Sequence, residues 1–206
     1  MKNGTPTVFV IDDDDAVRSS LRLLFKSYGL DAVMHASADE FLAGYDISRP
    51  GCLVLDVRMP GMSGPELQQR LNALGATIPI VFITGHGDVP MAVEAMQAGA
   101  FDFLQKPFRD DDLIERVQRA LARDAGQRAL LGARHDTRER LATLTPRERD
   151  VLNLVVVGKA NKVIAADLGL SQRTVEIHRA RVMEKMDAAS LAQLVRMVLD
   201  LERPAG

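Results

Sequence analysis

The sequence contains no tryptophan, one cysteine, and only seven phenylalanines and two tyrosines among 206 residues. This shortage of aromatic side chains argues against a protein that stacks the bases of single-stranded nucleic acid. Cys52 has no second cysteine with which to form an internal disulfide. A chain of this kind suits a reducing compartment, so we expect a cytoplasmic protein.

Long apolar runs are also missing. The apolar run Val8–Ile11 near the N-terminus is too short for the core of a signal peptide. The longest uncharged stretch, residues 71–87, is interrupted by glycine, proline and threonine. No span approaches the roughly 18 apolar residues that a membrane helix needs, so we expect no membrane partner.

Charge is distributed unevenly along the chain. Residues 1–122 hold 11 Lys and Arg against 17 Asp and Glu, a net charge of −6. Residues 123–206 hold 15 against 11, a net charge of +4. The opposite signs indicate two modules with different partners, although so small a basic excess is weak evidence for nucleic acid.

The front module alternates short apolar runs with amphipathic segments. Strands are predicted at residues 7–11, 32–35, 53–55, 78–83 and 101–104, with helical spacing of apolar residues after each. The continuous apolar strands fit burial on both faces. The pattern of five strand–helix units predicts an α/β module over residues 1–122, with a parallel sheet covered by helices on both faces.

Polar side chains follow four of these strands. Asp12 and Asp13 follow the first strand, Asp56 follows the third, Thr84 the fourth, and Lys106 ends the fifth. Ligands of parallel sheets bind at this carboxyl edge. Converging carboxylates need a cation, and a hard ion such as Mg²⁺ suits them. With Lys106, that ion would neutralise a phosphoryl group arriving on Asp56.

Each of these residues also has an ordinary interpretation. Acids at strand ends are often helix N-caps, and we favour that interpretation for Asp14 and Asp15. A lone Thr84 would be a loop residue, and a lone Lys106 a solvated one. The joint placement at four strand ends is what favours a site.

Four motifs carry a family resemblance: VIDDD (10–14), LDVRMPGMSG (55–64), FITGHGD (82–88) and DFLQKPF (102–108). Residues 7–122 with these motifs resemble a two-component receiver domain, which implies an α/β doubly wound (βα)5 parallel sheet, the flavodoxin-like fold. The resemblance implies that Asp56 takes a phosphoryl group from a sensor histidine kinase. It also implies that Asp13, Asp56 and the Arg58 carbonyl ligate Mg²⁺ (or Mn²⁺), with Asp12 acting through water.

The same resemblance assigns the switch residues. Thr84 and Lys106 would bind the phosphoryl group, and the aromatic switch position falls on Phe103. Many relatives carry tyrosine there, so a switch at Phe103 works by packing alone. The resemblance also implies a cis peptide bond between Lys106 and Pro107, the kind of bond where cis costs little.

The joint between the modules is residues 123–142, a charged stretch that contains Gly126 and Gly132. It either continues the last helix of the front module or forms a flexible linker. Most of its other residues favour helix, whereas an interior glycine costs about 1 kcal/mol against alanine. We expect a largely helical linker with a break near Gly132.

The back module, residues 143–206, reads as four helices. Thr145-Pro146-Arg147-Glu148 is a capping box with proline at the first helical position. A short helix over residues 161–168, a turn at Gly169 and a third helix capped by Ser171 make a helix-turn-helix. Its second helix is the element that usually enters the major groove of DNA.

The faces of that third helix can be sorted by turning 100° per residue. Val175, Val182 and Met186 should pack inward, opposite a DNA-facing surface centred on Arg173, Ile177 and Arg181. Arg179 is left open between an internal ion pair and a phosphate contact, and His178 reads more simply as a buried histidine with its partners satisfied. The candidate DNA contacts are Lys162, Arg173, Thr174, Glu176, Ile177, His178, Arg179, Arg181 and Lys185.

Residues 143–200 resemble a LuxR-type DNA-binding domain, through LTPRERDVLNLVVVGKANKVIAADLGLSQRTVEIHRARVMEKM and SLAQLVRM. One departure is Ala160, where many relatives carry Ser or Thr as a helix cap. Both resemblances together describe response regulators of the FixJ type. They imply a homodimer when phosphorylated, double-stranded DNA with paired half-sites, and RNA polymerase as a further partner.

Three functions are compatible with parts of this sequence. The first is a transcription regulator switched by phosphorylation of Asp56, with no enzymatic activity beyond its own phosphorylation and slow autodephosphorylation. The second is an Asp-nucleophile phosphatase, which typically needs a second aspartate two residues later, where this chain has Arg58. The third is a phosphorylation-independent DNA-binding regulator whose receiver is a relic.

Overall fold

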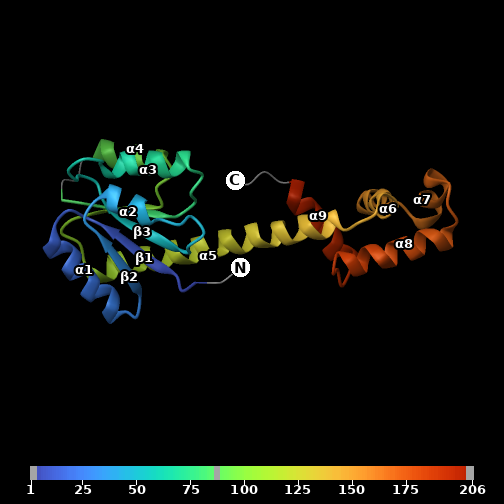
Figure 1. The fold of residues 1–206 in the computed structure, drawn as a ribbon, viewed down its shortest axis with the longest axis horizontal. Coiled ribbons are helices and arrows are strands. Elements are labelled where there is room, and N and C mark those ends of the chain that lie inside the picture. The colour runs from blue at the N-terminus through green and yellow to red at the C-terminus, as the bar shows by residue number, and fades with distance from the viewer. Residues whose placement is uncertain (1–3, 86–88, 203–206) are drawn as a thin grey trace. The chain divides into compact units, whose positions relative to one another are not determined.

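The computed structural model describes residues 4–85 and 89–202, and the chain divides into two compact units between Arg128 and Ala129. The last three residues of the FITGHGD motif, 86–88, lie outside the described residues. The elements of the first unit (Figure 1) are β1 (Thr7–Ile11), α1 (Asp15–Ser27), β2 (Asp31–His35), α2 (Ala38–Gly44), β3 (Gly51–Asp56), α3 (Gly64–Ala73), β4 (Ile80–Thr84), α4 (Val89–Gln97), β5 (Asp102–Gln105) and the start of α5 (Asp110–Ala142).

The five strands form one parallel sheet in the order β2-β1-β3-β4-β5. Every residue of β1, β3 and β4 is buried, whereas the edge strand β2 is partly exposed. Burial on both faces explains why the inner strands are apolar without alternation. The doubly wound α/β fold expected from the sequence is confirmed.

Helices cover both faces of this sheet, and Figure 1 shows α3 and α4 on one side and α1 on the other. One core joins Phe9, Leu53 and Phe82 of the sheet to buried residues of α2, α3 and α4. The second core joins the alternate strand residues to α1 and α5; its largest members are Leu21, Phe25, Ile83, Leu113, Ile114 and Val117. The strand side chains therefore alternate between two cores.

Gly64 begins α3 where the chain comes very close to β3. A Cβ atom on Gly64 would lie 2.5 Å from the carbonyl oxygen of Asp56 and 2.9 Å from Cε1 of Phe82. The helix is started by a capping box between Ser63 and Glu66. Glycine at this position lets α3 pack directly against the end of the strand that carries Asp56.

Strands β2, β3 and β5 span Asp31–His35, Gly51–Asp56 and Asp102–Gln105 rather than the expected 32–35, 53–55 and 101–104. Two further differences have a physical reason. The fourth strand begins at Ile80 rather than Ile78, because Pro79 has no N–H to donate and contributes only its carbonyl, which accepts from Leu53. Helix α5 continues from Asp110 to Ala142 without a break, so the interruption expected near Gly132 is absent. The cost of a glycine is small against that of ending a helix inside a run of good helix formers.

The start of the expected linker packs on the first unit. The buried carboxylate of Asp124 accepts the Gly51 amide at 2.9 Å and the Arg128 Nε at 2.8 Å. Arg128 also donates to the carbonyl oxygens of Ser48 and Arg49, both at 2.8 Å. These bonds explain why the compact unit extends to Arg128 rather than ending at residue 122.

The second unit contains the end of α5 with α6 (Pro146–Val156), α7 (Asn161–Leu168), α8 (Gln172–Lys185) and α9 (Leu191–Glu202). The capping box of Thr145 and Glu148 is present as expected, and Ser171 caps α8. The turn between α7 and α8 is made by Gly169 in the left-handed conformation, with φ of 68°. The expected helix-turn-helix is therefore formed.

The core of the second unit is separate from those of the sheet. It comprises Leu144, Val151, Leu152, Val155, Ile164, Ala165, Val175, Val182, Met186, Ala188 and Leu194. Each of the four helices α6–α9 contributes its apolar face, which is why none of them needs a partner in the sheet. Ala160 precedes α7 without a side-chain cap, as its methyl group requires.

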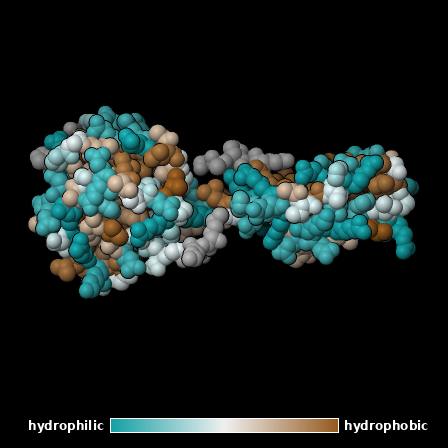
Figure 2. Space-filling model, in the orientation of Figure 1, coloured by the Kyte–Doolittle hydropathy of each residue, from teal (hydrophilic) through white to brown (hydrophobic). Residues whose placement is uncertain are grey.

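Apolar side chains at the surface are dispersed rather than gathered into one face. In Figure 2 brown residues are interspersed with teal ones over the visible surface. The exposed large apolar residues include Leu23, Val93, Met96 and Val157. Among the described residues, no helix combines the length and the apolar character that crossing a bilayer would require.

Candidate functional site

The expected site residues meet at the carboxyl edge of the sheet. Ile11 pairs with Leu55, which sets Asp12 next to the end of β3, and Thr84 of β4 pairs with Gln105 of β5. Asp12, Asp56 and Thr84 are buried, with relative exposures of 1%, 7% and 2%. The parallel strands thus deliver two carboxylates and a hydroxyl to the same end of the sheet.

Lys106 lies between the two buried carboxylates. Its Nζ is 2.8 Å from Asp12 Oδ2 and 2.9 Å from Asp56 Oδ1. Its backbone is fixed by a 2.7 Å hydrogen bond from its amide to the carbonyl of Thr84, and its peptide bond to Pro107 is cis, as expected. The ammonium group compensates the negative charge that would otherwise make two neighbouring buried carboxylates costly.

The pKa values of Asp56 and Lys106 are both raised, and in each residue burial opposes the effect of the ionic contacts. Burial raises the pKa of Asp56, while the hydrogen bonds from Lys106 and from the Arg58 amide, at 2.8 Å to Oδ2, lower it. Burial lowers the pKa of Lys106, but the contacts with Asp12 and Asp56 outweigh it and raise that pKa. Lys106 is therefore held as a cation beside Asp56.

The third expected carboxylate is placed differently. Asp13 is exposed, and among the described residues no three acidic, histidine or cysteine side chains gather closely enough to hold a metal ion. Asp14 turns away to cap α1 and donates its amide to Asp12 Oδ1 at 2.9 Å. Lys106 balances the charge of Asp12 and Asp56, and the convergence of Asp13 with these two carboxylates stays a prediction.

The donor set still fits a hard divalent cation. Asp12 and Asp56 present carboxylate oxygens at one edge, and the exposed Asp13 is the neighbour of Asp12 in sequence. Mg²⁺ commonly takes one or two protein carboxylates and completes its coordination with water. The residues present therefore have the chemistry that the ion requires.

Phe103, the expected switch residue, contacts one of the two cores of the sheet. Phe103 is partly buried and packs against the core that faces α4, and its amide donates to the Asp102 side chain at 2.8 Å.

Asp14 is the N-cap of α1, whereas Asp15 is the first residue of that helix and pairs with Arg18. The capping interpretation is therefore confirmed for Asp14 and wrong for Asp15.

Helix α8 has the two faces expected of a helix that reads DNA. Val175, Val182 and Met186 are buried in the core of the second unit. Arg173, Ile177, Ala180 and Arg181 are exposed, as are Glu176 and, on α7, Lys162. Thr174 is half-buried and bonded to the cap residue Ser171.

Three residues of the expected DNA surface, Lys185, Arg179 and His178, are partly buried in the second unit. Lys185 pairs with the buried carboxylate of Glu148, with 2.7 Å between Nζ and Oε2. Arg179 donates to Oδ1 of Asn161 at 2.7 Å, an internal hydrogen bond and not the ion pair considered above, and its contact with a phosphate stays a prediction. His178 is half-buried, and its Nδ1 has no hydrogen-bond partner in the described structure, so the interpretation with all partners satisfied is wrong.

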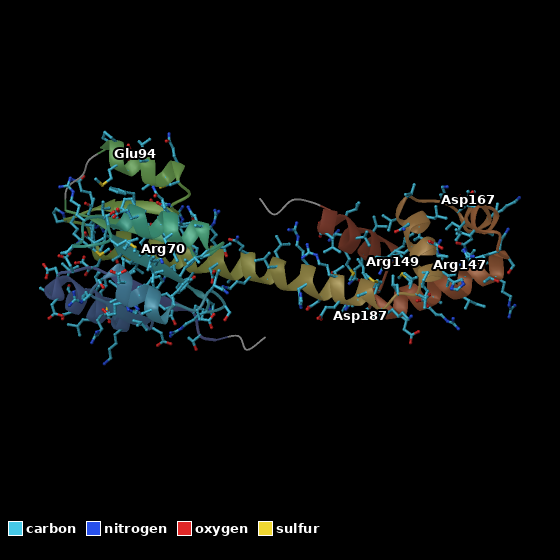
Figure 3. All side chains as sticks on the ribbon, turned by 45° about the horizontal axis from the view of Figure 1, so that its top comes forward. Arg70, Glu94, Arg147, Arg149, Asp167 and Asp187 are labelled. Carbon is cyan, nitrogen blue, oxygen red and sulfur yellow. The ribbon has the colours of Figure 1, made fainter. Side chains whose placement is uncertain are left out.

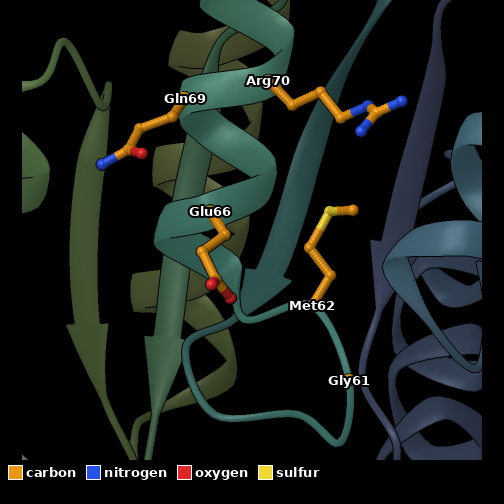
Figure 4. A pocket seen from close by; sticks show the side chains of 5 residues that line it. All are labelled: Gly61, Met62, Glu66, Gln69 and Arg70. Carbon is orange, nitrogen blue, oxygen red and sulfur yellow. The ribbon is translucent and has the colours of Figure 1, made fainter.

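A shallow hollow lies beside α3, outside the acidic edge. It is lined by Gly61, Met62, Glu66, Gln69 and Arg70 (Figure 4). The Glu66 carboxylate is occupied by Ser63, with which it forms the capping box of α3. No sequence motif predicts a site here, and the polar groups that line the hollow do not indicate one.

The comparisons with known proteins agree with this geometry. Residues 8–118 match the response regulator receiver domain, and residues 142–198 match the bacterial regulatory proteins of the luxR family. A receiver fold with an aspartate at its acidic edge, followed by a helix-turn-helix unit, defines a two-component response regulator that regulates transcription.

More particularly, the chain belongs to the response regulators of the FixJ type. It is 56% identical to the transcriptional regulatory protein FixJ of Azorhizobium caulinodans over 93% of this chain and 91% of that protein. The identity is 52% to FixJ of Rhizobium meliloti, over 94% of this chain and 95% of that protein.

Solved structures give the same assignment. The response regulator StyR matches with a TM-score of 0.86 and 45% identity, covering 95% of this chain and 99% of that one. Full-length FixJ from B. japonicum matches with a TM-score of 0.59 and 43% identity, covering 96% and 97%. Members of this family are generally transcription factors rather than enzymes, and receiver domains generally bind Mg²⁺.

Proposed function

We propose that Asp56 accepts a phosphoryl group from a sensor histidine kinase, and that this event controls dimerisation and binding to paired DNA half-sites. The observation that supports it most is the placement of Lys106, 2.9 Å from Asp56 and 2.8 Å from Asp12, beside a carboxylate that is buried but open at the sheet edge. A cation so placed favours an acidic group that gains further negative charge.

In the proposed reaction an oxygen of Asp56 attacks phosphorus as the bond to the kinase histidine nitrogen breaks. Mg²⁺ (or Mn²⁺), held by Asp13, Asp56 and the Arg58 carbonyl with Asp12 acting through water, supplies charge neutralisation when bound. Lys106 pairs with one phosphoryl oxygen and the Thr84 hydroxyl donates to another. Phe103, which has no hydroxyl, follows by repacking against the core.

The direct test is labelling with acetyl phosphate or a phosphoramidate, with and without Mg²⁺. Stoichiometric, Mg²⁺-dependent labelling of Asp56 supports the proposal, and its absence favours the phosphorylation-independent regulator with a relic receiver. Continuous turnover of a generic phosphatase substrate would instead favour an enzyme. We expect no turnover beyond self-phosphorylation and slow autodephosphorylation, in a cytoplasmic protein.

The DNA surface proposed for α8 is centred on Arg173, Ile177 and Arg181, flanked by Lys162, Thr174, Glu176, His178 and Arg179. Two of the four cations of this helix, Arg179 and Lys185, have partners inside the protein. One copy therefore neutralises few phosphates and binds weakly at physiological salt. Two copies on adjacent half-sites raise the effective concentration, which makes dimerisation a natural control, with RNA polymerase as the downstream partner.

Two surfaces are proposed to hold the phosphorylated dimer together. The first is made by α4, β5 and the first turns of α5, where Val93 and Met96 are exposed and Arg119 lies over the ring of Phe101 at 5.7 Å. The second is the apolar stripe of α9, on which Leu191 is exposed while Leu194 is buried in the core.

Replacing Asp13 by alanine should leave the fold intact and abolish labelling of Asp56. Asp13 is exposed, so its loss removes a repulsive charge without opening the core, whereas the proposed cation loses a ligand. The measurement is Mg²⁺-dependent labelling together with a thermal melt. The exposed Asp39 on α2 offers the matched control, Asp39→Ala, and normal labelling of the Asp13 variant would remove that residue from the site.

Replacing Arg173 or Arg181 by alanine should weaken DNA binding. If the lost contact is to a phosphate, the loss is similar on all sequences and the salt slope falls by about 1. If it is to a base, specificity relaxes by about 1–3 kcal/mol. Arg196→Ala, which removes an exposed cation from α9, is the control, and unchanged binding in both α8 variants would mean that the contact helix is misidentified.

A further inference from the structure

The carboxyl end of α8 is fastened to the end of α5. Arg140, in the last turn of α5, donates from one terminal nitrogen to the carbonyl oxygen of Met186 at 3.0 Å. Its other terminal nitrogen lies 3.1 Å from Oδ2 of Asp187, which is labelled in Figure 3. A cation at this position also meets the negative end of the α8 dipole.

Further side-chain contacts join the end of α8 and the start of α6 to the turn between α5 and α6. Lys185, the last residue of α8, donates to the carbonyl oxygen of Thr143 at 3.2 Å and to the buried Glu148 at 2.7 Å. Arg149 of α6 (Figure 3) donates to the carbonyl oxygen of Leu141 at 2.8 Å. The turn between α5 and α6 is thus tied to the end of α8 by side chains that are separate from the apolar core.

The backbone conformation immediately after α8 is unusual. Asp187 has φ of 52°, and it is the one described residue other than glycine with a positive φ. That conformation is uncommon for a residue with a side chain. In this conformation the largely exposed carboxylate of Asp187 pairs with Arg140, whose other terminal nitrogen binds the carbonyl oxygen of the preceding Met186.

We propose that Arg140 is a positioning residue for DNA binding, which sets the angle of α8 by fixing its carboxyl end and does not itself contact DNA. The inference rests on the proposed function of α8. The Ser171 cap holds the amino end of α8, Val175 and Val182 hold its middle, and Met186 and Lys185 anchor its carboxyl end together with Arg140. Without Arg140 the helix keeps the other anchors but loses the bonds that fix its last turn to α5, and recognition needs side chains held within about 0.5 Å of their working geometry.

The test uses the full chain, phosphorylated with acetyl phosphate and Mg²⁺, and two DNA probes. One is a duplex selected from a random-sequence library by the wild type, and the other is a scrambled duplex of equal length. Arg140→Ala is compared with Arg140→Lys, with Asp187→Asn, and with Arg138→Ala. Arg138 is exposed on the same helix, so its loss removes the same charge.

We expect Arg140→Ala to weaken binding to the selected duplex by about tenfold. Binding to the scrambled duplex and the salt slope should stay at wild-type values, because no phosphate contact is lost. Arg140→Lys should recover part of the affinity, and Arg138→Ala should match the wild type. The double variant of Arg140→Ala and Asp187→Asn should be no weaker than Arg140→Ala alone, since both act through one contact.

Other outcomes overturn the inference. Equal losses on both duplexes, with a salt slope shallower by about 1, would make Arg140 a direct phosphate contact. A loss explained by the unfolded fraction in a thermal melt would make its role structural only, and wild-type affinity would leave it without a role. If the wild type itself selects no sequence, the proposed function of α8 is wrong and the inference falls with it.

Discussion

Replacing Asp56 by asparagine is expected to abolish phosphorylation, dimerisation and tight DNA binding together. The amide has nearly the size of the carboxylate and preserves packing at the end of β3, but it cannot attack phosphorus. The variant should be monomeric and bind operator DNA poorly with or without a phosphoryl donor. The phosphorylated wild type should dimerise and bind at lower protein concentration, which light scattering and a gel shift on the same samples will measure.

Asp39→Asn is the matched control for this experiment, because it removes an exposed carboxylate from α2 of the same unit. It should behave as the wild type in all three assays. A different result for the wild type would be informative in its own right. If the phosphorylated protein stays monomeric yet binds DNA better, the switch is relief of inhibition by the receiver, and the dimerisation proposal is wrong.

Replacing Glu148 by alanine is expected to destabilise the second unit strongly. Glu148 is 2% exposed, and its carboxylate accepts the Thr145 amide at 2.9 Å and Lys185 Nζ at 2.7 Å. Alanine leaves the amide and the ammonium without this partner, which costs about 2–4 kcal/mol. Hydrogen exchange of α6 and α8 measures the loss, and the exposed Glu184→Ala is the control.

The same residue gives the second unit a pH dependence with a defined sign. The hydrogen bond from Lys185, together with that from the Thr145 amide, lowers the pKa of Glu148 from 4.5 to about 2. A lowered carboxyl pKa contributes stability that is present above pH 4.5 and is lost as the pH falls toward about 2. Glu148→Gln should lack this component, so urea unfolding of the two proteins should converge at low pH; an unchanged difference would contradict the assignment.

Local signals explain why so much of the fold was predictable. Each buried strand is a continuous apolar run, and the start of α6 is marked by Thr145 and Glu148, whose capping box needs only four consecutive residues. The main site follows from topology, because parallel strands must bring Asp12, Asp56 and Lys106 to one edge. Neither inference requires knowledge of which particular side chains, remote in sequence, contact one another.

The unpredicted features all depend on partners remote in sequence. Lys185 has the spacing of a surface cation, and only the position of Glu148 makes it an internal one. The sequence places Asp124 and Arg128 in the expected linker. Only the folded chain brings Gly51 to Asp124 and Ser48 to Arg128.

The pairing of β1 with both β2 and β3 has a consequence for how the chain folds. Thr7 is the register partner of Gly51, so the centre of the sheet closes only when segments separated by α1, β2 and α2 meet, whereas α6, α7 and α8 contact one another as near neighbours along the chain. Chains rich in local contacts fold faster than those dominated by remote pairing. The helical unit, though synthesised last, should therefore reach its native state in a faster kinetic phase than the sheet, and stopped-flow refolding should resolve two phases.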